Sequence, residues 1–233
     1  MPTVAEARVG TETVTAYFEA RLFAYELLRK SFRQEPERGF TLSLGFDGTV
    51  RSFPFAEESP EIARGIALMD SYLSDQTNTS QATFDRLHWD YTRMFIGPYK
   101  LAAPPWESAY RNKERLLFQG ETLAVRQVYR KYGLQAPAHF SEPDDHIGLE
   151  LDFLHQTSRR ARDLAEQGDT AQLVPLLRDQ LAFLEEHLLA WAPQFAADVA
   201  RSAETAYYQG LAHLLAGFLP VDRTILRELV QEA

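Results

Sequence analysis

Cysteine is absent from all 233 residues of the sequence. The chain therefore cannot form a disulfide, hold a metal or an iron–sulfur cluster through thiolates, or use a cysteine nucleophile. This absence also fits a reducing compartment, where disulfides are rare.

Long apolar runs are absent too. No stretch approaches the roughly 20 apolar residues that span a bilayer, so we expect no stable membrane insertion. Residues 1–12 have no apolar centre and carry Glu6 and Glu12, which argues against a signal peptide. We therefore predict a cytoplasmic protein.

Basic residues are in the minority, with 24 Lys and Arg against 33 Asp and Glu, for a net charge of −9. Because phosphate binding needs a basic surface, we predict no nucleic-acid partner. An acidic surface would instead speed the encounter with a basic partner.

The common catalytic motifs are missing, including a Gly-rich phosphate loop, a zinc-protease HExxH and a serine elbow. The nearest metal-like pattern is His146 with Glu150, spaced i, i+4 and preceded by Asp145. An Asp-His pair is similar to those of helical metal-dependent phosphohydrolases, but no second His-Asp pair supplies further ligands. One alternative is thus a helical metal-dependent hydrolase using these three residues. The other is a helix-start histidine bonded to a neighbouring carboxylate or backbone group, with no metal and no cofactor.

Apolar residues at helical spacing dominate the chain and predict an all-α fold. We expect a single-domain bundle of about eight helices over residues 1–233, because no repeat or low-complexity linker interrupts it. The predicted helices cover about residues 13–30, 60–74, 80–95, 121–132, 144–167, 171–191, 204–219 and 222–232, with a short segment at 193–201. Asp47-Gly48 between alternating apolar residues indicates a short hairpin or an extended loop near residues 40–55.

Acidic residues gather at one predicted helix start, in Glu142-Pro143-Asp144-Asp145-His146. Asp144 is a candidate N-cap or first-turn residue, and Asp145 adds negative charge where the helix dipole favours it. As structure, such carboxylates stabilise a helix by about 0.3–1 kcal/mol each. As function, Glu142, Asp144 and Asp145 could hold guanidinium groups through paired hydrogen bonds.

An aromatic, proline-rich loop is predicted at residues 96–120, where Pro104-Pro105 prevents a continuous helix. A long, structured loop of this kind is more often functional than decorative. Trp106 is its best ligand candidate, because aromatics beside a loop form a groove for an apolar helix or an extended peptide. The aromatic residues in and before the loop are Tyr91, Phe95, Tyr99, Trp106 and Tyr110.

These two stretches together resemble a known family. The series runs from Tyr91-Thr-Arg-Met-Phe95-Ile-Gly97-Pro98 through Pro104-Pro105-Trp106-Glu107-Ser108-Ala-Tyr110 and residues 114–118 to Glu142-Pro143-Asp144-Asp145-His146. It resembles the TorD/DmsD/NarJ-like redox enzyme maturation chaperones, most of all the dimethyl-sulfoxide-reductase chaperone branch. The resemblance covers about residues 85–155 and continues more weakly through residues 181–219.

The resemblance implies an all-α chaperone without catalytic activity. Such proteins bind the twin-arginine leader peptide of a molybdopterin-dependent oxidoreductase catalytic subunit and delay its export until the cofactor is inserted. The positions that match the leader-binding groove of the family are Tyr91, Phe95, Tyr99, Trp106, Ser108, Tyr110, Asp145 and His146. Tyr stands at positions 91, 99 and 110, where close relatives can have Trp, so the lining and the leader preference differ.

The residues agree with this implication. A leader peptide carries an arginine pair and then an apolar segment, and an acidic protein with an aromatic groove complements both. We expect the aromatic residues to carry affinity, at about 2 kcal/mol or more for a desolvated anchor. The acids would recognise the arginine pair, although exposed ion pairs contribute about 1 kcal/mol or less. Helical chaperones can swap elements, so a monomer and a domain-swapped dimer are both expected options.

Overall fold

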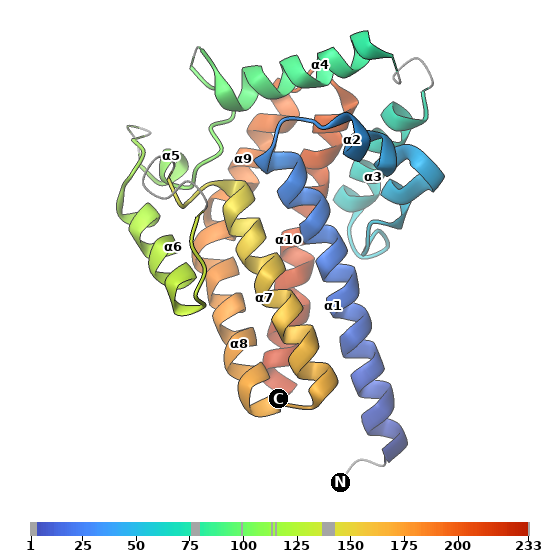
Figure 1. Ribbon diagram of the computed structural model, residues 1–233, viewed down its shortest axis with the longest axis vertical. Helices are drawn as coiled ribbons and strands as arrows, with labels where there is room; N and C mark the ends of the chain where they lie inside the picture. The colour runs from blue at the N-terminus through green and yellow to red at the C-terminus, as the bar shows by residue number, and fades with distance from the viewer. Residues whose placement is uncertain are drawn as a thin grey trace.

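A computed structural model describes residues 4–75, 80–98, 100–112, 114, 116–136 and 143–232 of the chain. These residues fold into helices joined by turns (Figure 1). The elements are α1 (Val4–Arg33), α2 (Arg38–Gly45), the 3-10 helix η1 (Phe46–Ser52), α3 (Pro60–Ser74), α4 (Gln81–Tyr91), the π-helix η3 (Thr92–Ile96), α5 (Ser108–Arg111), α6 (Gly120–Lys131), α7 (Ile147–Gln167), α8 (Thr170–Phe183), the π-helix η4 (Leu184–Leu188), α9 (Leu189–Ser202) and α10 (Ala206–Glu232).

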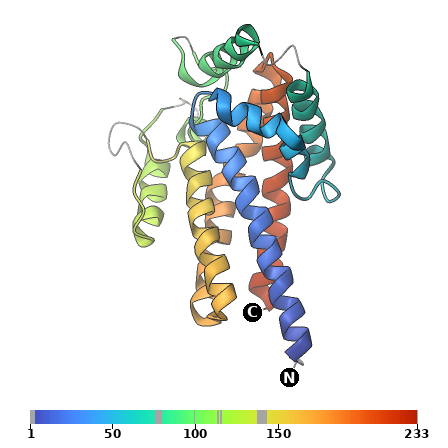
Figure 2. The same cartoon turned by 45° about the vertical axis from the view of Figure 1, so that its right-hand side comes forward.

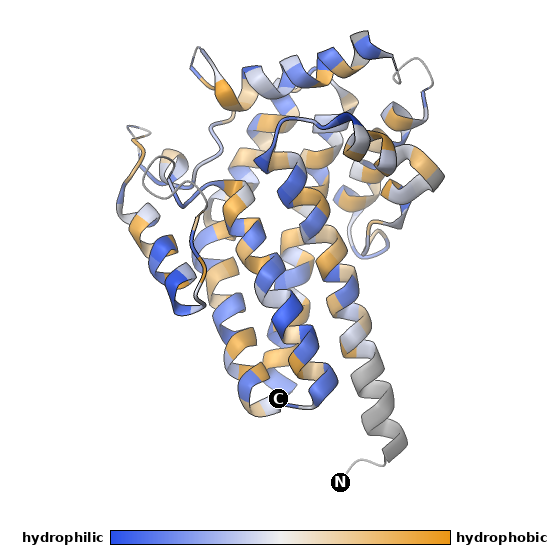
Figure 3. Cartoon of the chain, viewed as in Figure 1, coloured by the Kyte–Doolittle hydropathy of each residue, from blue (hydrophilic) through white to orange (hydrophobic). Residues whose placement is uncertain are grey.

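The long helices α1, α7, α8 and α10 form the body of the molecule (Figures 1 and 2). Helix α1 packs along α7, α7 packs on α8, and α10 packs against α3, α8 and α9. Hydrophobic and hydrophilic residues alternate along these helices, as amphipathic helices require (Figure 3). The all-α prediction is confirmed, and within the described ranges there is no helix long and apolar enough to cross a membrane. The single domain over residues 1–233 remains a prediction.

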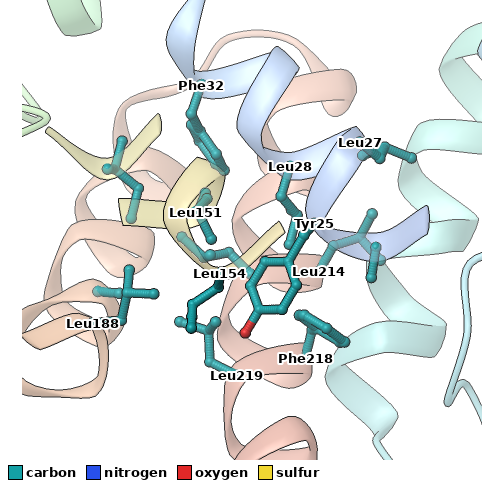
Figure 4. Packing of buried hydrophobic residues seen from close by; sticks show 14 of the residues in the cluster. Tyr25, Leu27, Leu28, Phe32, Leu151, Leu154, Leu188, Leu214, Phe218 and Leu219 are labelled. Atoms are coloured by element: carbon teal, nitrogen blue, oxygen red, sulfur yellow. The ribbon is translucent and has the colours of Figure 1, made fainter. Parts of the chain in front are cut away.

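The core forms where α1, α7 and α10 meet (Figure 4). On α1, Tyr25, Leu28 and Phe32 are buried at helical spacing. The Tyr25 ring meets that of Phe218 on α10 edge-on, with centroids 5.0 Å apart, and Phe32 lies near Leu151 of α7 (Figure 4). Burying each large apolar side chain stabilises the fold by about 1.5–3 kcal/mol. The periodicity of the sequence thus becomes one continuous core.

Helices α3 and α10 cross closely because glycine lies on both sides of the contact. A Cβ atom added at Gly65 would lie 2.8 Å from the carbonyl oxygen of Gly210, which is closer than real Cβ atoms approach. A larger residue at this crossing would force the two helices apart.

The predicted hairpin near residues 40–55 is wrong, because α2 and η1 occupy this stretch. Gly48 does adopt the left-handed conformation expected of an Asp-Gly turn, with φ of 69°. Leu44 of α2 and Val50 of η1 are nevertheless buried in the core. The ring of Phe53, which directly follows η1, lies 5.9 Å from that of Phe218. Helices satisfy their own backbone groups, whereas a lone two-stranded hairpin is marginal in water.

Two prolines also fail to separate helices as predicted. The helices predicted to end before Pro220 and to begin after it are one helix, α10, and Pro193 lies inside α9. An interior proline costs a helix about 3 kcal/mol. Burial of Leu219 and Asp222, which flank Pro220 on α10, shows that tertiary packing offsets this cost.

Candidate functional site

Helix α7 begins at Ile147, with His146 as its N-cap, and not at Asp144 as predicted. The Nδ1 atom of His146 accepts a hydrogen bond from the backbone N–H of Gly148 at 3.0 Å, so the imidazole is the N-cap. The backbone N–H of Ile147 donates to the carbonyl of Pro105 at 2.8 Å, which ties the helix start to the aromatic loop. Burial, reinforced by the charge of Arg33, lowers the pKa of His146 to about 3. The ring is therefore neutral at neutral pH.

Asp145 is fully buried and holds three segments together. Its Oδ2 accepts from the backbone N–H of Ser108 at 2.8 Å, and its Oδ1 accepts from the Thr122 hydroxyl at 2.7 Å. Its carbonyl accepts from the backbone N–H of Glu107 at 2.9 Å. Hydrogen bonds to a carboxylate are among the strong ones in proteins, so this residue firmly connects the loop, α6 and the approach to α7.

Asp144 is also buried, and α6 supplies its partners. Arg126 donates to its Oδ2 from Nε at 2.9 Å and from Nη2 at 2.6 Å. The Tyr129 hydroxyl donates to its carbonyl at 3.2 Å. Thr122, Arg126 and Tyr129 follow one another at i, i+4 and i+7, so one face of α6 holds Asp144 and Asp145. Sequence reasoning missed these three residues, although polar groups recurring at helical spacing on a buried face were a usable signal.

A second buried acidic pair lies behind the loop. Glu107 is bonded to Nδ1 of His187 at 2.8 Å, and Trp191 donates from Nε1 to Glu150 at 3.2 Å. Burial raises the pKa of Glu150 well above its ordinary value, and the nearby charges of Glu107 and Asp145 raise it further. Burial and the two neighbouring carboxylates therefore disfavour the charged form of Glu150.

Most of the predicted aromatic residues belong to the core. The Tyr91 hydroxyl donates to the carbonyl of Phe32 at 3.3 Å, and the Phe95 ring lies 5.9 Å from that of Phe195. Tyr110, at the edge of the core, lies against Trp191 with ring centroids 5.5 Å apart. These rings position the loop and leave little surface for a ligand.

Trp106 differs from these residues because it is partly exposed and also borders a cleft of about 220 Å³. Its ring also meets the imidazole of His146 edge-on at 5.8 Å, and the two residues form an isolated antiparallel bridge. We call this the Trp106 cleft; it is lined by Lys100, Leu101, Pro104, Trp106, Ala109 and Leu117. Three exposed apolar side chains lie near it along the chain, Leu116, Phe118 and Leu123. Such a run of exposed apolar residues is typical of an interaction site.

A larger cleft of about 570 Å³ lies elsewhere, between α2, α3 and α4, and Leu42 and Phe46 are exposed beside it. It contains none of the predicted site residues. The sequence therefore indicated the Trp106 cleft as a binding site but gave no indication of the larger cleft.

The predicted site residues thus fall into three groups. Trp106 and Tyr110 retain exposed surface, whereas Tyr91, Phe95, Ser108, Asp144, Asp145 and His146 are buried. Tyr99 and Glu142 lie outside the described residues. The structure therefore brings together Trp106, Ser108, Asp145 and His146. It places Tyr91, on α4, and Phe95, on η3, in the core.

The hydrolase alternative finds no ligand set in the described part of the chain, where no three His, Asp or Glu side chains converge to hold a metal ion. Both carboxylate oxygens of Asp145 accept hydrogen bonds from donors inside the protein, and Nδ1 of His146 accepts the hydrogen bond that caps the helix. In the structure, His146 is the N-cap of α7, Asp145 directly precedes it, and Glu150 lies in the first turn of the helix.

Comparison with known proteins finds a family model, curated relatives and a solved structure that are similar to this chain. A family model described as nitrate reductase delta subunit matches residues 56–197, more than half of the chain. The chaperone protein TorD of Aliivibrio salmonicida is 29% identical over 204 residues, covering 86% of this chain and 87% of TorD. The Tat proofreading chaperone DmsD of Salmonella typhi is 36% identical over 124 residues, covering 53% of this chain and 54% of DmsD. A crystal structure described as a redox enzyme maturation protein of Archaeoglobus fulgidus aligns over 90% of this chain and 93% of its own, with a TM-score of 0.43 and 21% identity.

Proposed function

This chain belongs to the nitrate reductase delta subunit family of redox enzyme maturation chaperones, and on that premise we propose that it binds the twin-arginine leader peptide of a molybdopterin-dependent oxidoreductase subunit. It acts as a chaperone and not as an enzyme. In this proposal it works in the cytoplasm, holds no cofactor itself, and keeps its client from export until the client's cofactor is in place.

The Trp106 cleft carries the proposal. It is the place where a predicted ligand-binding aromatic is both fixed by the fold and accessible, and its lining is mainly apolar. The apolar segment of a leader peptide fits such a lining, since burial of apolar surface contributes about 25 cal/mol per Å². The neighbouring Leu116, Phe118 and Leu123 extend the apolar surface for a segment longer than the cleft.

The arginine pair of the leader is drawn by the acidic charge of the whole chain, −9. Asp144 already binds Arg126, and Asp145 already accepts from Ser108 and Thr122, so neither offers an exposed carboxylate. Attraction between exposed charges acts over about 8–10 Å at physiological salt and weakens as salt rises. The pair therefore contributes to the rate of encounter more than to the final affinity.

Calorimetry with a synthetic leader peptide tests the proposal. The peptide carries Arg-Arg followed by an apolar segment, and a matched peptide replaces the apolar segment with Ser and Gly. We expect the parent chain to bind the first peptide and not the second. Trp106→Ala should weaken binding by about tenfold to thirtyfold, because a desolvated aromatic anchor contributes about 2 kcal/mol. Leu117→Ala should weaken it by a smaller factor.

The control is Leu42→Ala, which removes a similar apolar side chain from the larger cleft between α2, α3 and α4. It should bind the leader as the parent does. If Leu42→Ala weakens binding and Trp106→Ala does not, the leader lies in that other cleft and the proposed site is wrong.

A further inference from the structure

The carboxylate of Asp145 connects the loop that lines the Trp106 cleft with α6, which begins three residues after Leu117. One oxygen accepts from the backbone N–H of Ser108, two residues after Trp106. The other accepts from Thr122, in the first turn of α6 and five residues after Leu117. The bond from Glu107 to the carbonyl of Asp145 fastens the same loop a second time.

We propose that Asp145 is a positioning residue, which sets the width of the Trp106 cleft through Ser108 and Thr122 and does not itself contact the leader. This inference rests on the proposed function. An acidic residue beside a peptide site would ordinarily be taken as the partner of the leader's arginines, so the two roles make opposite predictions.

Burial argues for the positioning role. Asp145 is 0% exposed, and both of its oxygens already accept hydrogen bonds at 2.7 and 2.8 Å. An arginine of a client could reach it only by displacing the Thr122 hydroxyl or the Ser108 amide. Either group would then be left buried without a hydrogen-bond partner, which is unfavourable.

Thr122 makes the distinction testable, because it is buried and uncharged and cannot attract an arginine. Its hydroxyl reaches Asp145 from α6, whereas the cleft residues Pro104, Trp106 and Ala109 lie on the loop. Removing the hydroxyl loosens α6 against the loop and leaves every acidic charge in place. The positioning role therefore predicts that loss of the Thr122 hydroxyl lowers leader affinity as much as loss of the Asp145 carboxylate does.

Calorimetry on the full chain with two leader peptides decides between the roles. One peptide carries Arg-Arg before its apolar segment, and the other carries Gln-Gln in the same place. We expect Asp145→Asn and Thr122→Val each to lower the affinity for both peptides by the same factor. This factor is about tenfold, since a hydrogen bond to a charged group contributes about 1.5 kcal/mol. The double variant should be little weaker than either single one, because both changes break the same connection.

Two controls accompany these variants. Thr122→Ser keeps the hydroxyl and should bind as the parent does. Glu121→Gln removes an acidic charge from the residue beside Thr122 and should lower affinity at most slightly, and only for the Arg-Arg peptide. The inference is overturned if Asp145→Asn lowers the affinity for the Arg-Arg peptide alone and Thr122→Val changes the affinity for neither peptide. Asp145 then contacts the arginines directly.

Hydrogen exchange without peptide tests the same connection independently of leader binding. Asp145→Asn and Thr122→Val should speed amide exchange in residues 104–112 and 116–123 and leave the centre of α10 unchanged. Unchanged exchange in the loop overturns the inference even if the variants bind poorly. A parent chain that binds neither peptide contradicts the proposed function, while the exchange result still decides whether Asp145 holds the loop.

Discussion

Two buried clusters in this protein are each built on aspartate carboxylates that accept hydrogen bonds from other segments, but they connect different parts of the fold. In the helical body, Asp222 of α10 accepts from Arg21 at 2.8 Å, from Tyr17 at 2.7 Å and from Tyr25 at 2.6 Å, all three on α1. Arg21 also donates to Gln180 of α8. At the edge of the molecule, Asp144 and Asp145 accept from α6 and from the aromatic loop.

The difference lies in what each cluster connects. The Asp222 cluster joins helices that already share an extensive apolar core, and burial together with the negative charge of Asp222 raises the pKa of Tyr17 and Tyr25 well above the ordinary value. The Asp144–Asp145 cluster joins the aromatic loop and an outlying helix, α6, to the body (Figure 1). We infer that the first cluster determines global stability and that the second determines the shape of the proposed binding surface.

The largest expected effect comes from breaking the cluster in the body. Asp222→Ala should lower the free energy of unfolding by about 3–5 kcal/mol, because it leaves Arg21 charged and buried without its partner. Urea denaturation measures this loss. The double variant Arg21→Met with Asp222→Leu should recover much of it, since a buried ion pair can often be replaced by apolar residues. If Asp222→Ala unfolds at the same urea concentration as the parent, the pair contributes nothing to stability.

Breaking the edge cluster should have a smaller and more local effect. Arg126→Met removes the partner of Asp144 and should cost about 1.5–3 kcal/mol, the range for hydrogen bonds to charged groups. Hydrogen exchange should show faster opening of α6 alone, while α1 and α10 keep the protection of the parent. Equal acceleration in α1 and α10 would show that the two clusters belong to one cooperative unit, which would remove the contrast drawn above.

The smallest effect at neutral pH is expected at the cap of α7. The pKa of His146 is about 3 in the folded protein, below its ordinary 6.5, so below pH 6.5 the unfolded chain takes up a proton that the folded chain does not. This group therefore costs stability as pH falls from about 6.5 towards 3, by up to about 2 kcal/mol at pH 5.

His146→Asn keeps an N-cap acceptor and removes this titration. The variant should lose less stability than the parent between pH 7.5 and pH 5, as measured by urea denaturation at both values. A parallel loss in both proteins would mean that His146 takes up its proton normally in the fold. Leu42→Ala serves as a control, because it should follow the parent at both pH values.

Much of the fold followed from local signals. The helix predicted to start at residue 60 does start there, and the Ser59 side chain caps it. The helices predicted to end near residues 132 and 167 are followed by Gly133 and Gly168, which both adopt the left-handed conformation, with φ of 68° and 70°. These signals are reliable because capping and left-handed backbone depend on a few neighbouring residues.

The candidate site was predicted less completely. Trp106 followed from its place after two prolines, and Asp145 from its place at a helix start, but the acidic residues were expected to meet a client. Which partners an acid meets depends on segments far away in the sequence, such as Ser108 and Thr122, 37 and 23 positions before Asp145. The apolar residues Leu101 and Leu117 likewise became cleft residues only through the path of the loop.

The sequence alone thus determined the all-α class, most helix ends, the acidic character and the family, because each depends on local pattern or composition. Only the tertiary structure decided that Asp145 lies inside the molecule, that residues 38–52 are helical, and that Asp222 meets Arg21 across 201 positions. Burial is a property of what covers a residue, and the covering elements come from remote parts of the chain. For that reason, an acidic motif that the sequence presented as a surface for arginines became, in the folded protein, an internal support for the neighbouring cleft.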